Sequence, residues 1–102
     1  MNFNHLLIFQ KVAEKQHFTR AAEELFISQP AVSKQIAELE KQLGQPLFAQ
    51  VGRKIHLTEA GQILYDYATR IFALSTEAET ILDELHGLKR GRLAVGASTT
   101  IG

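Results

Sequence analysis

The chain has 102 residues, of which 45% are hydrophobic and 22% charged, a composition that fits one compact globular domain and argues against disorder. It contains no cysteine, which excludes disulfide bonds and thiolate metal sites. The longest apolar runs are only a few residues, far below the ~20 that a membrane-spanning helix needs, and residues 1–5 lack the features of a secretory signal. We therefore expect a cytoplasmic protein without membrane association.

Charged residues are distributed unevenly along the chain. The 11 basic and 11 acidic residues cancel, and a net charge of zero does not by itself favour nucleic-acid binding. However, residues 1–58 hold seven bases and five acids, residues 59–88 hold one base and six acids, and residues 89–102 hold three bases. Adjacent segments with opposite charge balances predict different roles.

The first 27 residues predict two helices. Residues 3–15 place apolar side chains at helical spacing, and these are Leu6, Phe9, Val12 and Ala13. Thr19 is expected to be the N-cap of a second, short helix that ends near Phe26. Ala21 and Ala22 in that helix are small and allow another helix to approach closely.

A third helix is predicted over residues 29–43. Ser28 is its expected N-cap, and Pro30 lies in the first turn, where a missing N–H costs nothing. Apolar residues then follow at helical spacing: Val32, Ile36, Leu39 and Leu43. Gly44 is the expected C-cap, and Pro46 prevents the helix from continuing.

Residues 47–58 change to a strand-like pattern. Two short strands are predicted at Leu47-Phe48 and at Ile55-His56-Leu57. The segment 50–54 between them contains a glycine and two bases and is expected to form the turn. The pattern therefore predicts a small β-hairpin.

The second and third helices, joined by a tight turn at residues 26–28, predict a helix-turn-helix. Such a motif places its second helix in the major groove of duplex DNA, where the N-terminal residues reach the base edges. The residues expected to project are Gln29, Ala31, Ser33, Lys34 and Gln35. Among them, Gln29 can pair with two edge atoms of adenine, and Lys34 can reach guanine or a phosphate. The hairpin then acts as a wing, whose Arg53 and Lys54 suit phosphates or the minor groove.

A long fourth helix is predicted from Glu59 to Leu88, with Thr58 as its N-cap. Thirty helical residues span roughly 45 Å, more than a domain of this size covers. Apolar residues alternate at spacings of three and four, the heptad pattern of a coiled coil: Leu64, Tyr67, Ile71, Leu74, Ala78, Ile81, Leu85 and Leu88. We therefore expect two chains to pair through this helix; the alternative is that the stripe packs on its own domain.

Residues 89–102 begin with a basic stretch, and residues 93–97 alternate as in the first strand of a further sheet. Because no partner strand follows, we interpret the chain as the front piece of a longer protein. The predicted fold is mainly α. It comprises a winged helix-turn-helix (1–58), a dimerisation helix (59–88), and a hinge with a short C-terminal strand stub (89–102).

Several segments together resemble the LysR-type transcriptional regulators. They are Phe18–Ala22 with Leu25, Ser28–Ile36, Leu39-Glu40, Leu43-Gly44, Leu47-Phe48 and Leu57–Gly61, at consistent spacing over nearly the whole chain. The resemblance implies a winged helix-turn-helix, a linker helix that pairs two subunits, and a following effector domain like a periplasmic binding protein. It implies a bacterial regulator that binds double-stranded DNA in the nucleoid as a homodimer, or as a tetramer when complete.

The resemblance also implies roles for single residues. Those that match DNA-contacting positions are Gln29, Pro30, Ala31, Ser33, Lys34 and, in the wing, Arg53; we assign Lys54, Thr19 and Arg20 to the same surface. Ser98 and Thr100 match positions that help hold a small coinducer, often an anion, in the effector domain. Lys34 stands where Arg is more usual, which turns a bidentate guanine contact into a point charge. Gln50 and Ala49 stand where Arg and Glu, in that order, are common, which is expected to remove one salt bridge of the wing or of an interface and to weaken phosphate binding.

No sequence feature indicates an enzyme, a cofactor or a metal site. The four histidines, His5, His17, His56 and His86, lack metal-ligand spacing. Phosphate-binding loops, dinucleotide fingerprints and serine-nucleophile motifs are absent. Two alternatives stay open. One is a dimerisation or protein-interaction module in which the helix-turn-helix is only scaffold, and the other is a different family of winged-helix repressors.

Overall fold

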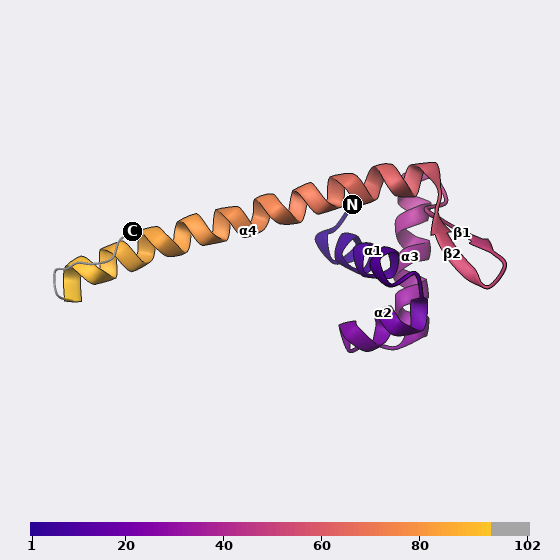
Figure 1. The fold of residues 1–102 in the computed structure, drawn as a ribbon, viewed down its shortest axis with the longest axis horizontal. Coiled ribbons are helices and arrows are strands. Elements are labelled where there is room, and N and C mark those ends of the chain that lie inside the picture. The colour runs from indigo at the N-terminus through magenta and orange to yellow at the C-terminus, as the bar shows by residue number, and fades with distance from the viewer. Residues whose placement is uncertain (95–102) are drawn as a thin grey trace. The chain divides into compact units, whose positions relative to one another are not determined.

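The computed structural model describes the backbone of residues 1–94 and the side chains of residues 1–87 (Figure 1). In chain order its elements are α1 (Phe3–Lys15), α2 (Phe18–Leu25), α3 (Gln29–Leu43), β1 (Phe48–Val51), β2 (Lys54–Leu57) and α4 (Glu59–Ala94). Contacts within the chain divide it into two units, Met1–Thr69 and the part that begins at Arg70. The first unit contains every element that was predicted to face DNA.

Helix α2 begins earlier than predicted. Its N-cap is His17, whose backbone is extended and whose Nδ1 atom accepts a hydrogen bond from the Arg20 N–H at 3.1 Å. The prediction of Thr19 as the N-cap is wrong, because Thr19 already lies in the first turn of the helix. Helix α2 ends at Leu25, and Phe26 follows in the left-handed conformation with a φ of 58°.

Helix α3 begins and ends as predicted. The Ser28 Oγ accepts a hydrogen bond from the Ala31 N–H at 3.2 Å, and Pro30 lies in the first turn. At the other end, Gly44 adopts a φ of 70°, a conformation that favours glycine. Its N–H donates to the Glu40 carbonyl at 2.8 Å and so satisfies one of the last carbonyls of the helix.

The hairpin has longer strands and a shorter turn than the apolar pattern predicted. The strands are antiparallel, and Val51 pairs with Lys54, so only Gly52 and Arg53 form the loop. Gly52 has a φ of 64°, as tight hairpin turns require. The first strand begins one residue later than predicted because Leu47 is buried in the core instead.

The core of the first unit is formed by α1, α2 and α3, which contact one another in every pair, with one residue from the connection before the hairpin and one from α4. Its buried apolar residues are Leu6, Ile8, Phe9, Val12, Ala21, Ala22, Val32, Ile36, Leu39, Leu47 and Ala68. The predicted buried faces of the three helices are thus confirmed, except that Ala13 is half-buried and Leu43 is exposed. The Phe48 ring packs on the rings of Phe9 and Phe18, with centroids 5.3 and 6.0 Å away, and so fixes the hairpin to α1 and α2.

Helix α4 begins as predicted and continues further. The Thr58 Oγ1 accepts a hydrogen bond from the Gly61 N–H at 3.0 Å, which makes Thr58 the N-cap. The helix continues to Ala94 instead of ending at Leu88, so no strand begins at residue 93. Residues 88–94 are mostly good helix formers, and one glycine among them is not enough to end a helix. The rest of the predicted strand stub, including Ser98 and Thr100, lies outside the described residues.

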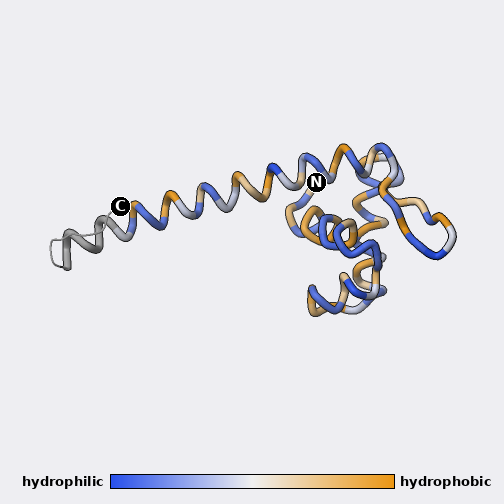
Figure 2. Tube along the Cα trace, viewed as in Figure 1, coloured by the Kyte–Doolittle hydropathy of each residue, from blue (hydrophilic) through white to orange (hydrophobic). Residues whose placement is uncertain are grey.

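Apolar residues recur along α4 between hydrophilic ones (Figure 2). Of the predicted heptad positions, Leu64 and Ile71 are half-buried within the chain, and the side chain of Leu88 is not described. The exposed heptad positions are Tyr67, Leu74, Ala78, Ile81 and Leu85. Within residues 1–94, no helix combines the length and the apolar content that crossing a membrane requires.

Candidate nucleic-acid interface

Helices α2 and α3 form a helix-turn-helix whose second helix buries one face and presents the other. Ala21 and Ala22 of α2 are buried, and their small side chains allow the close crossing of the two helices. Val32 and Ile36 anchor α3 in the core. In the turn between α2 and α3, the Ile27 N–H donates a hydrogen bond to the carbonyl of Ala22 at 3.1 Å, which closes the end of α2.

The residues of α3 that were predicted to face DNA lie on its first two turns. Gln29, Pro30 and Lys34 are exposed, whereas the side chains packed nearer the core are half-buried: Ala31, Ser33 and Gln35. The Ser28 hydroxyl occupies the N–H of Ala31, the Ser28 carbonyl accepts from the N–H of Val32, and Pro30 has no N–H, so the Gln29 N–H is the one donor of the first turn without an intrahelical partner. Such a helix end favours a negatively charged group such as a phosphate.

Two of these residues are already connected to each other. The Gln29 Nε2 donates a hydrogen bond to the Ser33 Oγ at 2.7 Å, one helical turn away. This bond uses one of the two N–H donors of the amide and leaves the other N–H and the carbonyl oxygen for a ligand. Gln29 is therefore held in one orientation before any DNA arrives.

The wing brings further predicted residues together. Arg53 and Lys54 are exposed at the hairpin end, where the Gln50 Nε2 donates to the Gly52 carbonyl at 3.4 Å. Between the hairpin and the start of α2 lies a hollow of about 270 Å³, whose polar lining residues are Gln16, His17, Thr19, Gln50 and Arg53. Thr19 and Arg53 thus line the same concave surface although they are distant in the sequence.

The ion pairs of the first unit decide which of its bases are already neutralised within the chain. Lys11 and Lys15 of α1 are both paired with Glu24, and Lys11 also with Glu14. The hydrogen bond from Lys15 holds the pKa of the Glu24 carboxyl below its usual range. The other bases of residues 1–69 have no ion-pair partner among the described residues, and they are Arg20, Lys34, Lys41, Arg53 and Lys54. The cations of α2, α3 and the wing are therefore available to an external anion.

Some residues at or near this surface were not predicted. His17, which lacks the spacing of a metal ligand, caps α2 and lines the hollow beside Arg53. The signal for this cap is weak, because the residues usual at this position are Ser, Thr, Asp and Asn, and the Nδ1 atom of histidine takes the place of their side-chain oxygen here. Lys41 is a further unpaired base on α3. Glu40 accepts a hydrogen bond from the Leu47 backbone N–H at 2.8 Å, a contact that no spacing rule indicates.

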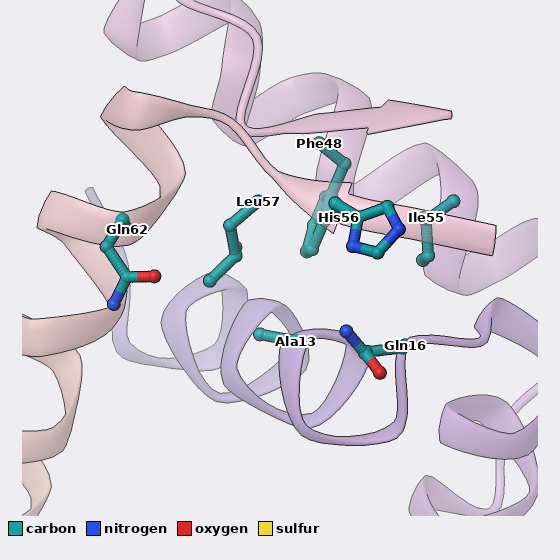
Figure 3. Close-up of a pocket in the computed structure, with 7 residues that line it drawn as sticks. All are labelled: Ala13, Gln16, Phe48, Ile55, His56, Leu57 and Gln62. Carbon is teal, nitrogen blue, oxygen red and sulfur yellow. The ribbon is translucent and has the colours of Figure 1, made fainter. Parts of the chain in front are cut away.

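A second hollow, of about 240 Å³, shares Gln16 and Ile55 with the first hollow. It lies between α1, the hairpin and the first turn of α4, and its polar lining side chains are Gln16, His56 and Gln62 (Figure 3). None of the residues predicted to bind DNA lines it. Across the described residues, no three histidine, aspartate or glutamate side chains gather as a metal site would require.

The chain is similar to several known regulators. Residues 3–62 match the family described as "Bacterial regulatory helix-turn-helix protein, lysR family". A "Probable RuBisCO transcriptional regulator" of Cyanidioschyzon merolae is 52% identical over 99 residues, with 97% of this chain and 33% of that protein covered. The "HTH-type transcriptional activator CmpR" of Synechocystis sp. is 44% identical over 93 residues, with 91% and 31% covered. Among solved structures, the BenM DNA-binding domain in complex with benA site 1 DNA has a TM-score of 0.81 at 34% identity, covering 84% of this chain and 97% of that one.

The three helices, the crossing of α2 and α3 and the hairpin define a winged helix-turn-helix of a transcription regulator. The chain belongs to the lysR family of bacterial regulatory helix-turn-helix proteins, as its sequence resemblance implied. The family consists of transcriptional regulators and not of enzymes. The chain spans about a third of the length of the curated relatives it matches.

Proposed function

We propose that this chain binds double-stranded DNA sequence-specifically as a homodimer and forms the DNA-binding part of a LysR-type regulator. One observation carries the proposal. The first two turns of α3 are anchored by Val32 and Ile36 and expose Gln29, Pro30 and Lys34. A helix presented in this way fits the major groove with its N-terminal residues toward the base edges. The similar BenM domain is described in complex with DNA, which supports the same use of this fold.

The unpaired bases supply the affinity in this proposal. Four bases neutralise DNA phosphates, and they are Arg20, Lys34, Arg53 and Lys54. The Thr19 hydroxyl donates a hydrogen bond to the DNA backbone from the hollow that Thr19 lines together with Arg53. Contacts to phosphates fix the position of the protein but do not read the sequence. Binding of this kind weakens steeply as the salt concentration rises.

The base contacts supply the specificity. The free N–H and the carbonyl oxygen of Gln29 match N7 and the N6 amino group of adenine, and Ala31 can contact a thymine methyl. Ser33, which accepts the bond from Gln29, retains its own hydroxyl hydrogen as a donor. Lys34 reaches a guanine edge or a phosphate as a point charge.

The exposed heptad positions of α4 supply the dimer. Leu74, Ile81 and Leu85 are large, apolar and exposed within one chain, and a matching α4 from a second chain covers such a stripe. The chain is then divided into a DNA-binding part (1–58), a pairing helix (59–88) and a C-terminal part (89–102). In the complete protein, Ser98 and Thr100 contribute to a coinducer site, and the protein acts in the cytoplasm on the nucleoid.

Selection from a random pool of duplexes tests the proposal without a known operator. We expect the selected sequences to be interrupted palindromes, and we expect binding to weaken as the salt concentration rises. A protein-interaction module with a merely structural helix-turn-helix would select no sequence and show no salt-dependent binding. A winged-helix dimer that pairs elsewhere would still select interrupted palindromes after the α4 stripe is disrupted.

A further inference from the structure

We propose that Glu40, Leu47, Thr58 and Gly61 form a joint that fixes the direction of the recognition helix α3 and the wing against the start of α4. We call these four residues the Leu47 joint. They come from the last turns of α3, the connection to the hairpin, and the N-terminus of α4. All four lie within the first unit of the chain.

The first half of the joint connects α3 to the segment before the wing. The Glu40 carboxylate accepts a hydrogen bond from the Leu47 N–H at 2.8 Å. The Glu40 carbonyl accepts from the N–H groups of Gly44 and Gln45, at 2.8 and 3.2 Å. One residue of α3 thus accepts three N–H groups of the outgoing backbone, and its carboxylate makes the bond to Leu47 a charge-assisted one.

The second half connects the same segment to α4. The Thr58 N–H donates to the Leu47 carbonyl at 3.0 Å, and the Thr58 hydroxyl donates to the Pro46 carbonyl at 2.7 Å. The same hydroxyl oxygen accepts the Gly61 N–H at 3.0 Å as the cap of α4. Leu47 is therefore bonded through its N–H to α3 and through its carbonyl to the start of α4.

Gly61 permits the close approach that these bonds need. A Cβ built on Gly61 would meet the Leu47 carbonyl oxygen far inside contact distance and the Leu57 Cδ2 at 3.0 Å. The Leu47 side chain itself is only 1% exposed, so the segment cannot move outward without opening the core. The joint is thus fixed by hydrogen bonds on two sides and by packing on the third.

The consequence concerns which DNA sites the dimer accepts, and it rests on the proposed function. If two chains pair through α4, the separation of their recognition helices depends on the angle at which each α3 leaves its α4. A rigid joint then selects one spacing of half-sites, because the second half-site is bound only if the geometry allows both contacts at once. Glu40 and Thr58 act as positioning residues and do not touch DNA.

Two variants and two matched controls test the joint in the whole chain. Thr58→Val removes the hydroxyl and keeps the shape, and Thr58→Ser retains the hydroxyl. Glu40→Leu removes the acceptor from the opposite side of the joint, and Glu40→Gln retains an acceptor. Each protein is titrated against a single selected half-site and against duplexes with two half-sites at varied spacing.

We expect the wild-type affinity to fall by about tenfold or more when the spacing changes by ~5 bp, half a helical turn. In Thr58→Val and Glu40→Leu we expect the affinities at the two spacings to differ by less than about threefold, while the affinity for a single half-site is retained. The controls Thr58→Ser and Glu40→Gln should behave as the wild type. If the spacing preference is unchanged in both Thr58→Val and Glu40→Leu, the proposed role of the joint is refuted. A loss of half-site affinity in both variants refutes it as well, because Glu40 and Thr58 would then be needed for the structure of the DNA-reading end of α3 itself. A wild-type profile without spacing preference would instead refute the dimeric recognition proposed above, and the joint with it.

Discussion

Alanine at Gly61 is expected to destabilise the chain, although alanine is normally the better residue in a helix. The new methyl group would overlap the Leu47 carbonyl oxygen and press on the Leu57 side chain. The backbone oxygen cannot rotate away, since the Thr58 N–H holds it at 3.0 Å. Overpacking of this kind costs about 1–3 kcal/mol, against a gain of roughly 0.5–1 kcal/mol from replacing a helical glycine.

The net loss is about 1–2 kcal/mol, which for a domain of this size lowers the Tm by roughly 5–15 °C. Gly87 provides a matched control in the same helix, because a Cβ there meets no atom within 4 Å. Gly87→Ala should therefore raise the stability by up to about 1 kcal/mol. Both variants are compared with the wild type by urea and thermal unfolding at one fixed protein concentration, because pairing of chains makes the Tm concentration-dependent. Equal effects of the two substitutions, or a stabilised Gly61→Ala, would refute the close packing at Leu47.

The other predictions concern DNA binding and pairing. Ser33→Ala should lower discrimination at the base pair read by Gln29 by about 1–3 kcal/mol and leave the salt dependence unchanged; equal weakening on all sequences would argue against base reading. Arg53→Ala should weaken binding to every sequence and reduce the salt slope by about one, whereas Lys15→Ala, which removes a base already paired with Glu24, should leave the slope unchanged. An equal change of the salt slope in Arg53→Ala and Lys15→Ala would contradict this prediction. Ile81→Asp should give monomers in analytical ultracentrifugation, because an unpaired charge in the seam opposes pairing, and a persistent dimer would place the interface elsewhere.

Local signals in the sequence were sufficient for much of the fold. Ser28 and Gly44 mark the two ends of α3. The Ser28 side chain accepts a backbone N–H of the first turn, and Gly44 adopts the left-handed conformation after the last turn, so both signals act within one turn of the residue. The apolar spacing of Val32 and Ile36 likewise predicted the buried face of that helix. Prediction was wrong where two local signals compete: Thr19 is a good cap, but His17, two residues earlier, already provides an acceptor.

The limits of the hairpin and of α4 were harder to predict for another reason. Strand pairing continues through polar residues as far as Val51 and Lys54, so apolar pattern alone underestimates the strands. Leucine, alanine and arginine after Leu88 suit a helix as well as an alternating strand, and α4 continues through them to Ala94. In both cases the backbone continues its pattern because nothing locally stops it.

The candidate interface was predictable residue by residue but not as an arrangement. Gln29 and Ser33 are four residues apart on a helix, so their hydrogen bond follows from helical geometry. The bonds of Leu47 to Glu40 and Thr58 depend on three elements meeting in space, and no periodicity in the sequence encodes them. The same holds for the pairing of Lys15 with Glu24 across α1 and α2, which decides which bases remain available for phosphates.

The insertion of the α3 N-terminus into the major groove is tested most directly by duplexes in which each purine of a selected half-site is replaced in turn by its 7-deaza analogue. This change removes the N7 acceptor from the major groove and leaves the phosphates and the minor groove intact. The account predicts that one such replacement weakens wild-type binding by about tenfold and has no effect on Gln29→Ala, which lacks the side chain that reads N7. Wild-type affinities that are insensitive to every replacement, or a Gln29→Ala variant as sensitive as the wild type, would contradict it.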